Sequence, residues 1–521
     1  MTNAIQKYTV WLPLLVGGIL RTLHLGGRSL WVDEGLTAIL VSVPLNETVA
    51  GCAVNSNPPL FYICLWPWVR ILGLSEFSLG LFAAVLGVLT IFFVYKLTRL
   101  IAGRRIAFIA AMMTAVAPFM VYASNDSRPY AFLGLMTIIA AYYFFRAINE
   151  NTWKLWVLTG IFTAASIYTH LVGFSVVLLE ILYLLLSKEY RSWKIIRNLA
   201  LSLAAVALIY LPQLFTTISQ MKLLRLYDFS HLGAADNGAG LKIVLIAVKQ
   251  FLGGFYRILS DYYFMNIGGQ GLGEITSAGR FFFALTLLFA FGLPVLIAAY
   301  FIKHKPEWGL FIVLMYLTPF VQVFWEGVDP RRFTPPASAL YIMAAMAFFK
   351  WKKPLKITVA LIFLSISALS LGKTYSMTSS IFKPEDYRKV SNIIRAHRSP
   401  HDAVIFHGGS CGSLTWQFYD PGGTIFGEPE YYPDNFNIFG MTPPEVVFSE
   451  EIFPASVDSL FGQDYRNAWM IISNRYPPDI MHLVENWYDR YPIEVSYTDQ
   501  YLTLLKIGPA FITAPDSAKI E

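Results

Sequence analysis

The feature that most constrains this chain of 521 residues is the repetition of apolar runs about 20 residues long. An α-helix needs a run of that length to cross the hydrocarbon core of a bilayer. The chain is 55% hydrophobic with a mean hydropathy of +0.51, outside the range of soluble globular domains. The sequence therefore predicts an all-α polytopic membrane domain with about 11 spans, roughly 8–25, 76–99, 106–123, 129–148, 154–170, 171–187, 194–215, 280–302, 307–325, 333–350 and 355–372.

Lys and Arg are concentrated in every second connection between these spans, from Arg104 and Arg105 to Lys352 and Lys353. Cytoplasmic loops of membrane proteins collect such residues, so the basic excess indicates orientation and not nucleic-acid binding. The other connections, and the tail that follows the last span, are then extracytoplasmic. Residues 8–25 are expected to be a membrane helix and not a cleavable signal peptide, because no small-residue cleavage site follows them.

The last part of the chain changes character. Residues 373–521 hold 19 acidic and 11 basic residues, and short apolar segments alternate there with helical patterns. This alternation predicts a small α/β extracytoplasmic domain after a membrane domain of residues 1–372. The expected elements are helices at 384–398, 413–419 and 479–490, strands at 403–406 and 469–472, a strand pair at 493–507, and a loop at 421–454.

The first outer loop is more than a connector. Residues 33–43 and 58–72 are apolar but too short to span, which suits interfacial helices, and residues 241–259 form a third candidate. Just before the first of these lies the adjacent carboxylate pair Asp33 and Glu34.

Several function classes find no support. The three cysteines form neither a disulfide framework nor a metal-ligand spacing. The glycine-rich stretch 268–273 does not match a nucleotide-binding fingerprint and follows no predicted strand.

Charged residues gather instead at the predicted outer ends of the spans. Charge near a membrane is costly unless it is paired or solvated, so this gathering indicates an outward-facing polar pocket. Alternatives remain for single residues: Glu34 could cap a helix starting at Gly35, and His170 could be an ordinary interfacial histidine. The gathered residues are Asp33, Glu34, Asp126, Glu326 and Asp329, with Arg128, Arg331, Arg332 and His170.

Three other charged or titratable residues invite structural readings. Arg21 and His24, at the end of the first span, could extend to the interface. Glu180 lies within a span, where we expect a packing role with a polar partner.

Transfer from a lipid-borne phosphate donor needs such a set. Arginine side chains hold phosphate oxygens, and a carboxylate can take the proton from an attacking hydroxyl or amine. Interfacial helices give a lipid tail an apolar surface. A competing hypothesis is a transporter or flippase of lipid-linked saccharides, but that class places ionisable groups near the midplane, often in repeated halves.

Four segments follow one another along the chain: Leu23-His24-Leu25 through Asp33-Glu34, Asn57-Pro58-Pro59-Leu60-Phe61-Tyr62, Tyr122 through Tyr130, and Asp329-Pro330-Arg331-Arg332-Phe333. In this order they resemble GT-C-fold membrane glycosyltransferases, the class of dolichyl-phosphate-mannose protein mannosyltransferases and aminoarabinose-type lipid A transferases. A fifth short element, Tyr168-Thr169-His170, also resembles the class.

The resemblance implies an inverting hexosyl- or pentosyltransferase of a prokaryotic plasma membrane. Its donor would be a polyprenyl-phosphate sugar, and its acceptor a lipid, a protein or a cell-wall polymer. Asp33 would be the catalytic base, supported by Glu34 and Asp126. The resemblance leaves a divalent metal open, because Asn57 stands where relatives often carry His or Lys. The substrate-binding residues would be Asn57, Arg128, Tyr130, His170, Arg331 and Arg332.

Overall fold

The computed structural model describes residues 10–54, 57–230, 296, 306–319, 330–349, 351–375, 386–407, 415–416, 418–419, 425–427, 466–473, 491–498 and 502–508. The expected span 280–302 (apart from residue 296), the surface helix 241–259, the helix 479–490, and Glu326 and Asp329 lie outside these residues. The chain forms two compact units, one of residues 1–25 and 52–379 and one of residues 26–51 and 380–521. The division into domains 1–372 and 373–521 stays a prediction.

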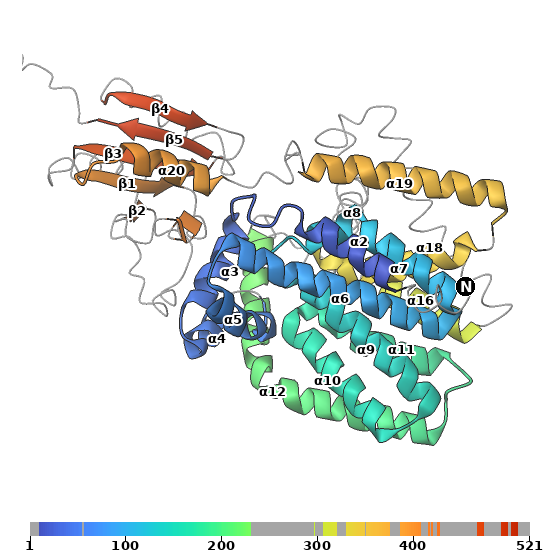
Figure 1. Cartoon of the computed structure of the whole chain (residues 1–521). Helices are drawn as coiled ribbons and strands as arrows, with labels where there is room; N and C mark the ends of the chain where they lie inside the picture. The colour runs from blue at the N-terminus through green and yellow to red at the C-terminus, as the bar shows by residue number, and fades with distance from the viewer. Residues whose placement is uncertain are drawn as a thin grey trace, which may run out of the picture. The chain divides into compact units, whose positions relative to one another are not determined.

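The first unit is helical (Figure 1). Each expected span within the described residues coincides with one or two helices. Three of them, α6, α9 and the part of α12 up to Ile218, are long and apolar enough to cross a membrane. The helices are α2 (Trp11–Thr22), α5 (Leu60–Leu72), α6 (Glu76–Ala102), α7 (Arg104–Val116), α8 (Pro118–Ala123), α9 (Tyr130–Glu150), α10 (Trp153–Thr169), η1 (Leu171–Gly173), α11 (Phe174–Leu186), α12 (Trp193–Ser230), α16 (Pro306–Leu317), η5 (Pro330–Phe333), α18 (Thr334–Phe348) and α19 (Lys353–Tyr375).

Helix α9 lies in the middle of this unit. It packs against α6 and α10, which lie beside it in Figure 1, and also against α18. Gly134 allows the close approach of α18, because a Cβ there would lie 3.0 Å from the Cβ of Thr334. Most side chains of α9 are buried, including Phe144 and Phe145 against Phe311 of α16.

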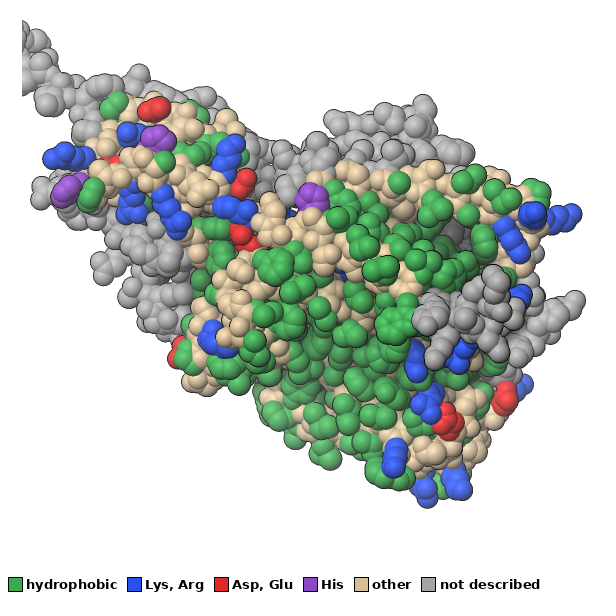
Figure 2. Space-filling model, viewed as in Figure 1, with side chains coloured by type: hydrophobic (Ala, Val, Ile, Leu, Met, Phe, Trp, Pro, Cys, Tyr) green, Lys and Arg blue, Asp and Glu red, His purple; other side chains and the backbone are tan. Residues whose placement is uncertain are grey.

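The outer surface of the helical unit is apolar. Figure 2 shows a broad hydrophobic face over the helices, with Lys and Arg side chains gathered at one end of them. On α12, Leu208 and Phe215 are 71% and 72% exposed. Apolar side chains that face outward over this extent indicate a surface made for lipid and not for water.

The second unit contains a five-stranded sheet with the order β2-β1-β3-β5-β4. Strand β1 pairs in parallel with β2 and β3, and β5 pairs antiparallel with β3 and β4. This confirms the predicted small C-terminal sheet. Its elements are α20 (Tyr387–His397), β1 (Asp402–His407), β2 (Ile425–Gly427), β3 (Asn467–Ser473), β4 (Ile493–Thr498) and β5 (Leu502–Ile507).

Two elements differ from the sequence prediction. Strand β2 lies in the stretch expected to be a loop. Its three residues, Ile425–Gly427, are too few to show an alternating pattern in the sequence, and they pair with Val404–Phe406. In the first outer loop, α3 (Val32–Ser42) and α5 match the expected helices, but α4 (Leu45–Val54) was not predicted. The Thr48 hydroxyl closes the turn between α3 and α4 by donating to the carbonyl of Leu40 at 2.9 Å.

Candidate functional site

In the first unit, two candidate residues, Asp126 and Arg128, lie in the Asp126 turn, residues 124–129, between α8 and α9. Helix α8 is short: it begins at Pro118, after the extended residue Ala117, and ends at Ala123. The side chains of Asp126 and Arg128 are buried, at 1% and 4% exposure. The turn is therefore enclosed by protein, where charge is retained only if other groups compensate it.

Arg331 supplies such compensation. Its Nη1 lies 4.0 Å from Oδ2 of Asp126, and its guanidinium carbon lies 5.0 Å from the centre of the Tyr130 ring. The Thr334 hydroxyl donates to the carbonyl of Tyr130 at 2.8 Å. The structure thus brings together Asp126, Tyr130 and Arg331, three residues chosen from the sequence.

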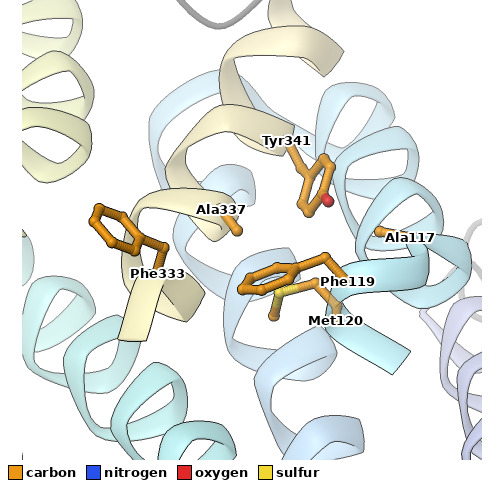
Figure 3. Close-up of a cluster of buried hydrophobic side chains, with 6 residues drawn as sticks. All are labelled: Ala117, Phe119, Met120, Phe333, Ala337 and Tyr341. Carbon is orange, nitrogen blue, oxygen red and sulfur yellow. The ribbon is translucent and has the colours of Figure 1, made fainter. Parts of the chain in front are cut away.

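Apolar packing fixes this arrangement. Phe333, Ala337 and Tyr341 of η5 and α18 form one buried cluster with residues of the α8 segment (Figure 3). Because η5 and α8 share this cluster, Arg331 and the Asp126 turn are held at neighbouring ends of packed elements. The α8 side of the cluster consists of Ala117, Phe119 and Met120.

Arg21 was misjudged as a residue that extends to the interface. It is completely buried, and its Nε donates to the hydroxyl of Ser124 at 3.0 Å. Its Nη atoms donate to the carbonyls of Gly17, Thr114 and Ala115. Arg21 therefore ties α2 and α7 to the first residue of the Asp126 turn. An arginine within an otherwise apolar run was the sequence signal for this role.

The side chain of Arg128 leaves the Asp126 turn and contacts α5, the helix that Asn57 precedes. Nη1 of Arg128 donates to the Tyr62 hydroxyl of α5 at 3.3 Å, and Asn57, which precedes α5, is buried. Arg332 is partly buried beside Arg331 in η5. Burial raises the pKa of the nearby Cys52 thiol to about 12, while the charge of Arg128 opposes that rise. Cys52 is thus a neutral thiol at physiological pH.

His170 has a structural position. It is buried, and its Nδ1 accepts the backbone N–H of Val172 at 3.2 Å at the start of η1. Its ring centre lies 6.0 Å from that of Tyr130. His170 therefore turns the chain between α10 and η1 next to a candidate residue.

In the second unit, Asp33 and Glu34 lie in the first turn of α3 and differ in environment. Glu34 is 1% exposed, forms an ion pair with Arg28, and accepts the backbone N–H of Trp31 at 3.4 Å. Asp33 is partly exposed. Glu34 caps a helix that starts at Val32, three residues before the expected start.

Glu180 behaves as expected for a packing residue. It is completely buried in α11, and the Thr163 hydroxyl of α10 donates to its Oε1 at 2.7 Å.

As for metals, the described ranges contain no group of three His, Cys, Asp or Glu side chains placed to hold an ion.

Comparisons with known proteins show what the chain resembles. Residues 56–215 match the model of the family described as dolichyl-phosphate-mannose-protein mannosyltransferase. That range includes Asn57, Asp126, Arg128, Tyr130 and His170. No curated protein sequence matches significantly.

Solved structures share the fold over nearly the whole chain. ArnT from Cupriavidus metallidurans bound to undecaprenyl phosphate has a TM-score of 0.56 at 15% identity, covering 95% of this chain and 97% of that one. The oligosaccharyltransferase AglB from Archaeoglobus fulgidus, with an inhibitory peptide and a dolichol-phosphate, has a TM-score of 0.55 at 13% identity, covering 98% and 75%. An oligosaccharyltransferase from Archaeoglobus fulgidus in complex with Zn and sulfate has a TM-score of 0.54 at 14% identity, covering 95% and 72%. These similarities show that the chain has the fold of these solved structures, and that residues 56–215 resemble the mannosyltransferase family.

Proposed function

We propose that this protein transfers a sugar from a polyprenyl-phosphate-linked donor to an acceptor on the extracytoplasmic face of the membrane, with inversion. The observation that carries the proposal is the group formed by Asp126, Tyr130 and Arg331, with Arg128 in the same turn. The proposal is also supported by the ligands of the similar structures, undecaprenyl phosphate in ArnT and dolichol-phosphate in AglB.

The arginines of the first unit suit the donor phosphate. A guanidinium presents several N–H groups in a fixed plane and binds phosphate oxygens with charge-assisted hydrogen bonds. Arg331 is partly exposed, with its charge near Asp126 and its plane near the Tyr130 ring. Arg128, Arg331 and Arg332 would stabilise the negative charge that grows on the phosphate as the sugar leaves.

Asp33 is the better candidate for the base. The carboxylate of Glu34 is already engaged with Arg28 and with the N–H of Trp31, and it is buried. Asp33 is partly exposed in the first turn of α3, so an acceptor can approach it. Environment thus separates two adjacent carboxylates into a proposed base and a structural partner.

The reaction balances without a further reagent. The acceptor hydroxyl or amine attacks the anomeric carbon while the bond between that carbon and the phosphate oxygen breaks. Asp33 takes the acceptor proton, and the electron pair of the broken bond leaves with the polyprenyl phosphate. Loss of a positioned general base typically costs about 100- to 10,000-fold in rate.

The test compares Asp33→Asn with Glu47→Gln, which removes a carboxylate from the first turn of α4 in the same loop. Each purified variant in detergent receives a panel of labelled polyprenyl-phosphate sugars with lipid, peptide and glycan acceptors. Release of polyprenyl phosphate is measured without any gradient, which separates transfer from transport. We expect Asp33→Asn to lose turnover while Glu47→Gln keeps it. Full turnover by Asp33→Asn would exclude Asp33 as the base.

A further inference from the structure

The second unit contains a set of bonds between the tail and the first-loop segment, residues 26–51. The Tyr419 hydroxyl accepts the backbone N–H of Leu30 at 2.7 Å and the hydroxyl of Ser29 at 3.2 Å. Tyr419 is itself tied to α20, because the Ser391 hydroxyl donates to its carbonyl at 3.4 Å. One buried tyrosine therefore joins the tail to the chain just before α3.

Arg388, in the first turn of α20, holds the same stretch further upstream. Its Nη2 donates to the carbonyl of Gly26 at 3.1 Å and to that of Arg28. Its backbone N–H donates to the hydroxyl of Ser29 at 3.3 Å. The side chain of Arg28 forms the ion pair with Glu34. Arg388 is therefore linked to the carboxylate pair through Arg28.

Thr415 completes the set on the side of α3. Its hydroxyl donates to the carbonyl of Val32 at 3.2 Å. A Cβ added to Gly35 would lie 2.6 Å from the Cα of Thr415. Any residue other than glycine at position 35 would therefore force the backbone of α3 or of the tail to move. The first turn of α3 and the tail are therefore in direct backbone contact.

Tyr419, Arg388 and Thr415 each bond to a main-chain group of residues 26–32, immediately before the carboxylates, and Tyr419 and Arg388 also bond to the hydroxyl of Ser29. Such bonds fix the direction in which the first turn of α3 presents its side chains. We infer that Tyr419, Arg388 and Thr415 are positioning residues, through which the tail domain sets the orientation of Asp33 for transfer. This inference rests on the proposed role of Asp33 as the base.

The test uses full-length protein in lipid nanodiscs and the variants Tyr419→Phe and Arg388→Ala. The matched control is Arg395→Ala, which removes the same charge from an exposed position of α20. Amide exchange over residues 26–36 reports whether the loop is held. The release of polyprenyl phosphate, measured against donor concentration, reports kcat and KM separately.

We expect faster exchange at and around Leu30 in Tyr419→Phe, because its N–H loses its acceptor. We also expect kcat to fall by about 10- to 100-fold, as small misplacements of catalytic groups do, with the donor KM within twofold. Arg388→Ala should behave alike, and Arg395→Ala should match the unmodified protein. A fold-only role would lower the amount of folded protein and leave kcat per folded molecule unchanged.

Two results would overturn the inference. Unchanged exchange in Tyr419→Phe and Arg388→Ala would show that these side chains do not hold the loop. Faster exchange with unchanged kcat would show that transfer does not depend on the bonds between the tail and the first-loop segment. If even the unmodified protein releases no polyprenyl phosphate, the proposed function fails, and the exchange measurement still decides separately whether the tail holds the first-loop segment.

Discussion

The two acidic segments of this protein are held by different means. The Asp126 turn lies between helices of the first unit and is fixed by apolar packing, by Arg331 and by buried Arg21. The stretch before Asp33 lies in the second unit and is fixed by side-chain bonds from the tail to its backbone. Changes near the first segment should therefore affect folding and activity together, and changes near the second should affect activity alone.

The turn of the first unit depends on a contact among three helices. Gly87 of α6 leaves room there, since a Cβ would lie 2.1 Å from the Ser124 hydroxyl and 2.7 Å from Nε of Arg21. Arg21 fills this space and donates to one hydroxyl and three carbonyls. A buried cation with this many partners is costly to disturb, because its removal leaves the acceptors unpaired.

Arg21→Met should have the largest effect. Met fills a similar volume but donates no hydrogen bond, so we expect a loss of about 2–3 kcal/mol of stability and loss of transfer. The measurements are thermal unfolding in detergent and the polyprenyl phosphate release assay. Arg105→Met, at an exposed position of α7, is the control and should change neither. An active Arg21→Met protein of normal stability would remove the distinction between the two segments.

Gly35→Ala should come next and should affect only the second segment. The added methyl group would collide with the backbone of Thr415, so either α3 or the tail must move. We expect a fall in transfer of about 100-fold, in line with misplaced catalytic groups, with the unfolding of the helices unchanged. Amide exchange over residues 26–36 should rise at the same time. Normal transfer by Gly35→Ala would show that close contact with the tail is dispensable.

The same contrast explains what could be predicted from the sequence. The helices of the first unit follow from apolar run length, and the grouping of Asp126 with Arg331 follows from charges at predicted helix ends. Tyr130 is predicted only through the family resemblance. The sequence also indicates Arg21, as a cation inside an apolar run, but the same pattern fits a side chain that extends to the interface. No sequence pattern predicts the bonds from Tyr419, Arg388 and Thr415, because they join residues more than 350 positions apart and act on backbone groups that any sequence provides.

Lowering the pH should weaken the sheet of the second unit through Asp402, and this tests whether the tail unfolds separately from the helices. Desolvation raises the pKa of Asp402, but bonds from Ser399, Asn467 and Trp469 outweigh it and hold that pKa below its ordinary value. A lowered pKa stabilises the folded state above the unfolded value of about 4 and loses that effect as the pH falls through the folded value. We expect the sheet to loosen below about pH 4, detected as faster amide exchange in β1 and β3. Asp402→Asn should loosen the sheet already at neutral pH and remove this acid dependence, and an unchanged acid response in that variant would refute the assignment.

Glu180→Gln should have the smallest effect and tests whether burial alone makes a carboxylate functional. Glu180 is as buried as Asp126, but its described partner is a hydroxyl, whereas Asp126 lies beside an arginine. A glutamine oxygen can accept the same bond from Thr163, so transfer and unfolding temperature should stay near their original values. Thr163→Val removes the donor and leaves the buried carboxylate unpaired, which should cost about 1–3 kcal/mol of stability without a selective loss of kcat. If Glu180→Gln instead abolished transfer in a folded protein, the carboxylate of α11 would belong to the reaction, and a neighbouring arginine would no longer distinguish a catalytic acid from a packing one.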